Sequence, residues 1–286
     1  MSETWTIARV LGWATEDFKA RGLESARLDA ELLLCEALAT DRVKLIVEGQ
    51  RPLEAAELSR YRDLIKRRRS GEPVAYILGR REFFGLQFRV DRRALIPRPD
   101  TEALLEVALA RTRHEYMFGN VLDLCTGSGC VAIAFAKQRP TWRVTALDAC
   151  EDAIALAVEN ATRLGAVFGI RFGVGDLTEP LAESERFDLV TANPPYIPSA
   201  DIASLDPSIR DFEPRAALDG GPDGLAIVRR VVSESAPRLV PGGILAVEVQ
   251  YDQSDRVAEL FGGAGLTDIE RRRDYGGHER VVSGKR

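Results

Sequence analysis

Cysteine and histidine are scarce in this chain of 286 residues, which has four cysteines and two histidines. The cysteines are Cys35, Cys125, Cys130 and Cys150, and no two of them form a C-x-x-C pair. A structural zinc site needs clustered thiolate or imidazole ligands, so the sequence predicts no metal site. Scattered thiols are typical of a protein in a reducing compartment, and we expect this one in the cytoplasm.

Long apolar runs and an excess of basic residues are also missing. No stretch has the roughly 18 consecutive apolar residues of a membrane helix, and the start, MSETWTIARVL, lacks the regions of a signal peptide. The formal net charge is −5, which disfavours a membrane surface or naked duplex DNA as the main partner. We therefore expect no membrane partner and no direct nucleic-acid partner.

Length and pattern predict two domains joined by a short linker. Residues 1–72 carry apolar side chains at helical spacing, which predicts a small helical domain. Residues 73–95 alternate around glycines and predict a β-hairpin linker, in which we include the apolar run at 74–78. Residues 96–286 form the predicted second domain.

A basic cluster, Lys66-Arg67-Arg68-Arg69, ends the second predicted helix, at 53–69. Basic side chains suit a helix C-terminus, where the backbone dipole is negative, so a solvated helix end is one interpretation. Contact with a partner or with RNA is the other, and the sequence leaves both open.

From residue 120 onward, strands and helices alternate. The predicted strands are 121–124, 143–147, 170–174, 187–191 and 244–249, and the predicted helices are 130–137, 152–164, 223–239 and 254–262. Such alternation implies an α/β fold, a mostly parallel Rossmann-like sheet covered on both faces. The stretch 198–224 has many turn residues, and we expect either a loop at the substrate entrance or an ordinary surface loop.

A glycine turn joins the first of these strands to the first helix, in the segment VLDLCTGSGC at 121–130. Gly127 and Gly129 would let the backbone approach a ligand beyond the carboxyl end of the strand. The turn lacks a third glycine for a pyrophosphate and a Gly-Lys-Ser/Thr phosphate clamp. A lone Gly-x-Gly does not identify the nucleotide.

Acidic residues at three successive strand ends narrow the range of cofactors that the site could bind. Asp148 follows Gly129 by 148 − 129 = 19 residues, where a ribose-binding carboxylate is expected. Asp123 could attract an ammonium or sulfonium group, and Asp176 lies where a contact to the adenine edge would come from. Each alone could be a cap or turn residue, but together they favour S-adenosylmethionine as the cofactor.

The tetrapeptide Asn193-Pro194-Pro195-Tyr196 follows the strand predicted at 187–191. An amide nitrogen is a poor nucleophile because its lone pair is delocalised, so an enzyme must hold the NH₂ group with oxygen acceptors. The Asn193 side chain and the Pro194 carbonyl are the expected acceptors, on a turn that two prolines stiffen. Tyr196 offers a flat face for a planar amide or base. The pattern favours methyl transfer by positioning and electrostatics, and the other interpretation is a proline-rich turn that only ends a strand.

At this point the sequence resembles the release-factor glutamine methyltransferases (the HemK or PrmC family) over nearly its whole length. The motifs that carry the resemblance are GEPVAYILG at 71–79, EFFG at 82–85, LIPRPDTE at 95–102, NPPY at 193–196, EP at 213–214, ALDGGPDG at 217–224, RDYGG at 273–277 and RVV at 280–282. The resemblance implies a seven-stranded methyltransferase sheet behind a small helical N-terminal domain that helps to dock the protein substrate. The substrate would be the glutamine of the Gly-Gly-Gln motif in class-1 peptide chain release factors, and we expect the enzyme to be a monomer.

The resemblance also implies roles for individual residues. Contacts to S-adenosylmethionine would come from Cys125, Thr126, Gly127, Ser128, Gly129, Asp148, Asp176, Leu177 and Asn193. The catalytic residues would be Asn193, Pro194 and Tyr196, and the substrate amide would lie against these and Pro195.

The chain departs from the family pattern at three places. Cys125 replaces the usual first glycine of the loop, and we expect a cysteine there to keep an ordinary negative φ and to add bulk near the methionine part of the cofactor. Leu177 stands where an aromatic residue is common, so it can cover adenine without stacking on it. After Glu248, a valine takes the place of a common glycine.

Two other functions remain open at this stage. The first is an amino-methyltransferase acting on a flipped base of DNA or RNA, which uses the same Asn-Pro-Pro-Tyr chemistry. The acidic charge balance and the lack of a basic recognition domain count against it. The second is a binding module without catalysis, and the intact acceptor motif counts against that.

Overall fold

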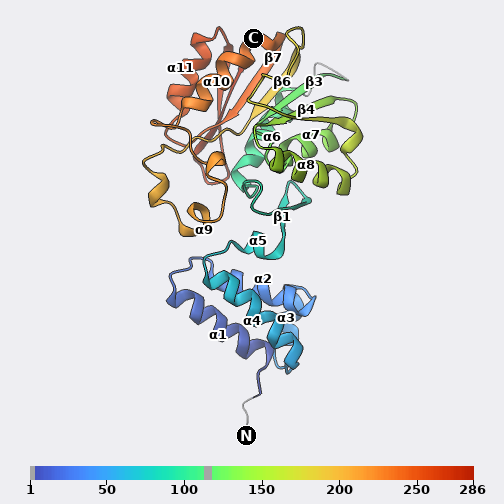
Figure 1. Cartoon of the computed structure of the whole chain (residues 1–286), viewed down its shortest axis with the longest axis vertical. Helices are drawn as coiled ribbons and strands as arrows, with labels where there is room; N and C mark the ends of the chain where they lie inside the picture. Colours follow the sequence, from blue (N-terminus) through green and yellow to red (C-terminus); the bar gives the residue numbers. More distant parts are fainter. Residues whose placement is uncertain (1–3, 113–117) are drawn as a thin grey trace. The chain divides into compact units, whose positions relative to one another are not determined.

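The protein is described by a computed structural model that covers residues 4–112 and 118–286 (Figure 1). His114, one of the two histidines, lies outside the described residues. The chain divides into two compact units. The first consists of the chain up to Gly79 together with Pro207–Phe212, and the second consists of Arg80–Asp206 and Glu213–Arg286.

The first unit is helical. Its helices are α1 (Ile7–Ala20), α2 (Ala26–Leu38), α3 (Arg42–Val47), α4 (Ala55–Arg69), α5 (Val74–Leu78) and the short α9 (Pro207–Arg210). Phe18, Leu33 and Tyr61 are fully buried between α1, α2 and α4. The Tyr61 hydroxyl donates a hydrogen bond to the Ala30 carbonyl at 3.0 Å, so the one polar atom of that ring is satisfied inside the core.

The basic cluster at the end of α4 is occupied by ion pairs within this unit. Arg68 pairs with the buried Asp29 of α2 at 2.7 Å. Arg67 and Arg69 bind Glu72 and Asp17, each through two hydrogen bonds, and Lys66 pairs with Asp63. The cluster therefore ties the end of α4 to its neighbours, which favours the structural interpretation over contact with RNA.

Helix α5 corrects one expectation, because the apolar run at 74–78 was predicted as part of the hairpin. Pro73 precedes this helix and Gly79 ends it with a left-handed φ of 67°. A short apolar run does not distinguish a strand from a buried turn of helix, and burial of Tyr76 and Ile77 decides for the helix here. The hairpin itself begins just afterwards, with β1 (Arg80–Phe83) and β2 (Leu86–Arg89).

The second unit is built on a seven-stranded mixed sheet, as predicted. Its strands are β3 (Asn120–Leu124), β4 (Arg143–Asp148), β5 (Ile170–Val174), β6 (Phe187–Ala192), β7 (Leu239–Glu248), β8 (Thr267–Arg273) and β9 (Glu279–Lys285). The order is β5-β4-β3-β6-β7-β9-β8, and β9 runs antiparallel to both of its neighbours, β7 and β8. The chain order reverses between β3 and β6, and a sheet of this kind binds ligands beyond the strand ends at that point.

Helices cover both faces of the sheet (Figure 1). They are α6 (Glu102–Arg111), preceded by the 3₁₀ turn η1 (Pro99–Thr101), and α7 (Cys130–Gln138), α8 (Glu151–Arg163), α10 (Ala226–Ser235) and α11 (Ser254–Gly263). Helices α7 and α8 lie on one face, and α10 and α11 on the other. Strand β6 is buried along nearly its whole length, which agrees with its mostly apolar sequence, FDLVTA.

The parallel register brings four residues into one row. Leu124 of β3 pairs with Leu147 of β4 and with Ala192 of β6, and Ala192 pairs with Val247 of β7. The next residues along these four strands are Cys125, Asp148, Asn193 and Glu248. Side chains that are far apart in sequence therefore meet at one edge of the sheet.

The stretch predicted as a loop at 198–224 is irregular. It contains only short helical turns, among them η3 (Ile202–Ser204) and η4 (Arg215–Ala217). A bridge between Ile197 and Asp219 returns the chain to the strand end after β6. Within the described residues, no helix has the length and apolar character needed to cross a membrane.

Candidate functional site

The glycine turn from Cys125 to Gly129 links β3 to α7. Gly127 and Gly129 have φ angles of 55° and 79°, in the left-handed region that favours glycine. A side chain at Gly129 would also lie 2.9 Å from Ile133 and 3.1 Å from Ala157. Glycine is required here for the backbone conformation and for close packing against α8, and both requirements restrict the conformation of the turn.

Asp148 is held against this turn by two backbone amides. The N–H groups of Gly127 and Cys150 donate to its two carboxylate oxygens, at 2.8 Å and 3.0 Å. Burial raises the pKa of Asp148, while these two hydrogen bonds act in the opposite direction. Each oxygen keeps a lone pair that can accept a further hydrogen bond, as a ribose diol would require.

Asp123 is more deeply buried, at 2% exposure. The hydroxyls of Thr126 and Thr191 donate to its two oxygens at 2.6 Å and 2.7 Å. Burial raises its pKa to about 6, against the opposing effect of these hydrogen bonds. A carboxylate in this place supplies negative potential to the space in front of the glycine turn.

The third strand-end carboxylate differs from the other two. Asp176 is exposed and forms an ion pair with Arg230 at 2.9 Å. Its contact with an adenine edge therefore stays a prediction, and the Arg230 guanidinium occupies part of its hydrogen-bonding capacity. The neighbouring Leu177 is buried at 6% exposure and lies in the same cavity wall.

The expectation that Cys125 keeps an ordinary φ is wrong, because its φ is 56°. Leu177 also has a left-handed φ, of 51°. This conformation costs a residue with a side chain about 1–2 kcal/mol, because Cβ approaches the following carbonyl oxygen. Both residues lie in the wall of the same cavity, so the site contains two strained positions.

The turn from Asn193 to Tyr196 follows β6 directly. Asn193 is half-buried, and its Nδ2 atom donates to Thr101 Oγ1 at 3.2 Å. Pro194 is buried, and Pro195 contributes to the cavity wall. The Tyr196 hydroxyl donates to the buried Glu248 at 3.3 Å. The two ends of the turn are thus anchored by hydrogen bonds to Thr101 of η1 and Glu248 of β7.

A second glycine-rich segment supports this turn from behind. The Gly220 N–H donates to the Ile197 carbonyl at 2.8 Å. A side chain at Gly220 would lie 2.8 Å from the Pro195 carbonyl oxygen, and one at Gly224 would collide with the Tyr196 carbonyl. Close backbone approach explains the glycines of the 217–224 motif, which hold the Asn-Pro-Pro-Tyr turn in place.

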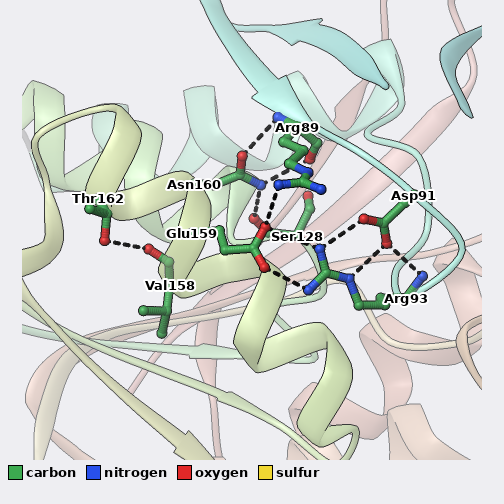
Figure 2. Close-up of polar contacts among 8 residues, drawn as sticks. All are labelled: Arg89, Asp91, Arg93, Ser128, Val158, Glu159, Asn160 and Thr162. Carbon is green, nitrogen blue, oxygen red and sulfur yellow. Dashed lines mark hydrogen bonds and ion pairs between the residues drawn. The ribbon is translucent and has the colours of Figure 1, made fainter. Parts of the chain in front are cut away.

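Asn160 supports the glycine turn from the other side, and sequence reasoning missed it. Figure 2 shows its carboxamide between the hairpin strand and the glycine turn. Its Oδ1 accepts from the Arg89 N–H at 2.7 Å, and its Nδ2 donates to the carbonyls of Arg89 and Ser128, each at 3.0 Å. Asn160 is fully buried on α8. The signal was a polar residue on the apolar face of a predicted helix.

An arginine beside Asn160 extends this support (Figure 2). Arg93 binds Asp91 and Glu159 through paired hydrogen bonds of 2.8–3.1 Å. It also lies in the wall of the cavity. The segment that follows the hairpin and α8 are therefore joined by charge-assisted bonds at the edge of the site.

Glu213 joins two segments that line the opposite wall. Its carboxylate is buried and accepts from the Ile96 N–H at 3.1 Å and from Arg98 at 2.5 Å. Residues 94–98 and 214–217 lie on the cavity wall, apart from Arg215. Glu213 had been noted in the sequence only as part of a motif, and its anchoring role required the tertiary structure.

These groups surround a cavity of about 310 Å³. Its wall includes residues 125–128 of the glycine turn, the three carboxylates and Asn193 with Pro195. Gly129, the last residue of the turn, is not part of the wall. Of the described residues in the Asn-Pro-Pro-Tyr turn, Pro194 and Tyr196 are not part of this wall. A larger, more open hollow of about 850 Å³ lies between α10 and α11, away from the strand ends.

No group of three histidine, cysteine or acidic side chains suited to a metal ion occurs in the residues that the structure describes. The four cysteine thiols are free. Burial raises the pKa of the Cys125 and Cys130 thiols, so neither is a thiolate near neutral pH. The chemistry available to the site is that of oxygen acceptors and carboxylates.

Comparisons with known proteins agree with this architecture. Residues 9–79 match the family model of the PrmC N-terminal domain, and residues 100–204 match that of the methyltransferase small domain. A release factor glutamine methyltransferase of Geobacter sulfurreducens is 46% identical over 283 residues, which cover 99% of this chain and 98% of the relative. One of Caulobacter vibrioides is 39% identical over 281 residues, covering 98% and 96%.

A solved methyltransferase of Pyrococcus furiosus has a similar fold, with a TM-score of 0.53 at 17% identity over 79% of this chain and 98% of that chain. The mixed seven-stranded sheet and the methyltransferase domain define a class I methyltransferase. The chain belongs to the family of release factor glutamine methyltransferases.

Replacing Asn160 with alanine should destabilise the fold and weaken binding of S-adenosylmethionine, the cofactor that the sequence predicts. The Arg89 and Ser128 backbone groups would lose their buried partner, at a cost of about 2 kcal/mol in the free energy of unfolding. Calorimetric titration and urea denaturation measure the two effects. Thr162→Ala is a matched control, since Thr162 is exposed on the same helix and bonds only the Val158 carbonyl (Figure 2). Equal cofactor affinity in Asn160→Ala and wild type would contradict the supporting role.

Substitutions at Cys125 should follow its left-handed φ. Cys125→Gly is expected to change the free energy of unfolding by less than about 1 kcal/mol, because relief of strain offsets the greater freedom of the unfolded chain. Cys125→Val should lower it by more than about 1 kcal/mol, since a β-branched residue tolerates this φ poorly. Cys150→Val, at a position with a φ of −98°, serves as the control. If valine were tolerated equally at both positions, the backbone argument would be wrong.

Proposed function

We propose that this enzyme transfers the methyl group of S-adenosylmethionine to the side-chain amide nitrogen of the glutamine in the Gly-Gly-Gln motif of peptide chain release factors. The observation that carries the proposal is Asn193, whose amide nitrogen is bound by Thr101 on one side while its oxygen accepts no hydrogen bond from any described residue. That oxygen belongs to a side chain in the wall of the cavity that contains the glycine turn and Asp148. The names of the relatives agree with the proposal.

The residues of the cavity fit this cofactor. S-adenosylmethionine, when bound, supplies an electrophilic methyl group on a positively charged sulfur. Asp148 would accept the two ribose hydroxyls through its remaining lone pairs, and Asp123 would attract the positive charge. Backbone groups of Thr126, Gly127 and Ser128 would border it, with Cys125 and Leu177 as apolar walls. Gly129 is not part of that wall and would contribute through the shape of the turn.

The substrate amide would be held by two oxygen acceptors. Asn193 Oδ1 and the Pro194 carbonyl would each accept one N–H hydrogen of the glutamine side chain, which fixes the direction of the nitrogen lone pair. Two acceptors also make the nitrogen more electron-rich. Tyr196, anchored through its hydroxyl, would offer its ring to the planar amide. After transfer, the extra amide proton would leave to water.

We also propose that the helical residues 1–72 form the domain that docks the protein substrate, with residues 73–95 as linker and residues 96–286 as the catalytic domain. The enzyme would act as a monomer in the cytoplasm, without binding nucleic acid. The free thiols and the net charge of −5 support this setting.

The main test is mass spectrometry of a purified release factor after incubation with enzyme and cofactor. We expect one added methyl group on the glutamine of the Gly-Gly-Gln motif. In Asn193→Ala, turnover should fall roughly 10²- to 10³-fold, as for other lost acceptors or donors at a reaction centre, while cofactor affinity changes much less. Asn120→Ala, at an exposed asparagine of β3, is the control. Modification of a nucleic acid but no release factor would overturn the proposal, and an equal loss of affinity and turnover would make Asn193 structural.

The docking role of residues 1–72 needs a separate comparison of two substrates. A chain lacking these residues should methylate an intact release factor much more slowly than the full chain does. Its rate on a short Gly-Gly-Gln peptide should change little, which also shows that the shortened chain has folded. Full efficiency on the intact factor would rule out a docking role.

A further inference from the structure

The orientation of the Asn193 carboxamide decides what it can do. A half-turn about its last side-chain bond exchanges the oxygen, which accepts hydrogen bonds, with the NH₂ group, which donates them. Only the oxygen can bind the N–H groups of a substrate amide. With the NH₂ group in its place, two donors would face each other.

Thr101 holds the nitrogen end of this carboxamide. Thr101 is 2% exposed, and its hydroxyl accepts the hydrogen bond from Asn193 Nδ2 at 3.2 Å. A hydroxyl has one hydrogen and two lone pairs, so its own hydrogen still needs an acceptor. Thr101 precedes α6 but does not use its side chain to cap that helix. Its hydrogen is therefore free to go to another neighbour.

Glu248 is a neighbour with one carboxylate oxygen that lacks a donor. Its side chain is fully buried at the end of β7, and Oε1 accepts from the Tyr196 hydroxyl at 3.3 Å. Its Oε2 atom is buried and has no hydrogen-bond partner of good geometry in the described part of the chain. The Thr101 hydroxyl nevertheless lies near enough to lower the pKa of this carboxyl. One group has an unassigned hydrogen and the other a buried, unpartnered oxygen, and the two are neighbours.

We propose that Thr101 and Glu248 are positioning residues that set the orientation of Asn193. The Glu248 carboxylate accepts a hydrogen bond from the Thr101 hydroxyl, so that this hydroxyl presents only its oxygen lone pairs to Asn193. The carboxamide must then turn its NH₂ group toward Thr101 and leave Oδ1 for the substrate. This inference rests on the proposed function, because it assigns a cause to the acceptor role of Asn193.

The charge on Glu248 determines the direction of this series of hydrogen bonds. Burial raises its pKa to about 7, while Thr101, Arg280 and Tyr196 act in the opposite direction. Below pH 7 the neutral carboxyl can donate to Thr101, whose hydrogen can then turn to Asn193 Oδ1. Because the pKa is raised, the productive orientation is favoured above pH 7 and is lost as the pH falls below that value.

Four other titratable or charged groups surround Glu248, and each comes from a different element. Tyr196 follows β6, Asp100 lies in η1, Arg280 in β9 and Cys130 at the start of α7. Burial raises the pKa of Tyr196 and Cys130 above neutrality, and the pKa of Arg280 is raised as well. The charges of these three groups therefore stay constant while Glu248 titrates near pH 7.

The test uses full-length enzyme with release factor as substrate. Thr101→Val keeps the shape of the side chain but has no hydroxyl, so kcat should fall about 10- to 100-fold, as for outer partners of other functional side chains. The dissociation constant for S-adenosylmethionine should stay within about 3-fold, and Thr101→Ser should restore most of kcat because it returns the hydroxyl. Thr112→Val is a matched control, since Thr112 is buried at the C-terminal end of α6 and its hydroxyl donates to the Ala108 carbonyl.

The second part of the test measures kcat as a function of pH. In wild type, kcat should rise as the pH increases through about 7, and Glu248→Gln should have a low kcat without this rise. A Thr101→Val enzyme as fast as wild type, or a Glu248→Gln enzyme with an unchanged rise, would overturn the inference while the proposed function stands. A wild-type enzyme that methylates no amide would overturn both. If Thr101→Val fails to fold, the profile of Glu248→Gln decides.

Discussion

Parallel pairing of four neighbouring strands is the constraint on which the site depends. Hydrogen bonds along β4, β3, β6 and β7 place Asp148, Cys125, Asn193 and Glu248 in one row, each one residue past the last matched pair. A slip of one residue in any strand would turn its side chain to the other face of the sheet. The apolar strands, buried on both faces, resist such a slip because each slip would expose or strain packed side chains.

Burial at these strand ends has a second consequence, which is electrostatic. Asp123 and Glu248 are removed from water, so their charged forms are disfavoured and their pKa values rise to about 6 and about 7. Hydroxyl groups of threonine and tyrosine then become the main partners of these carboxyls. A hydroxyl can donate and accept at once, so it transmits the preference of a carboxyl to the next side chain in line.

The turns that face the cavity are supported by buried polar groups on elements remote in sequence. Asn160 of α8 forms hydrogen bonds with the glycine turn and with the hairpin. On the opposite wall, Glu213 joins its own segment to residues 96–98. Two strained residues, Cys125 and Leu177, persist between such supports. This agrees with the general rule that a rigid scaffold maintains unfavourable backbone conformations near a functional site.

Much of this protein followed from its sequence alone. Strand and helix periodicity predicted five strands of a mostly parallel sheet, and the family resemblance implied that the sheet has seven. Local chemistry predicted that the glycine turn, Asp148 and Asn193 would lie at strand ends, because these signals depend on neighbours along the chain. The helix at 74–78 and the φ of Cys125 were predicted wrongly, since burial and close packing outweigh local preference. The supporting roles of Asn160, Thr101 and Glu248 were recognisable only in the fold, because the hydrogen bonds that they form reach residues 32 to 92 positions away in the chain. The sequence determined which groups are present, and the tertiary structure decided which of their hydrogen-bonding atoms face the cavity.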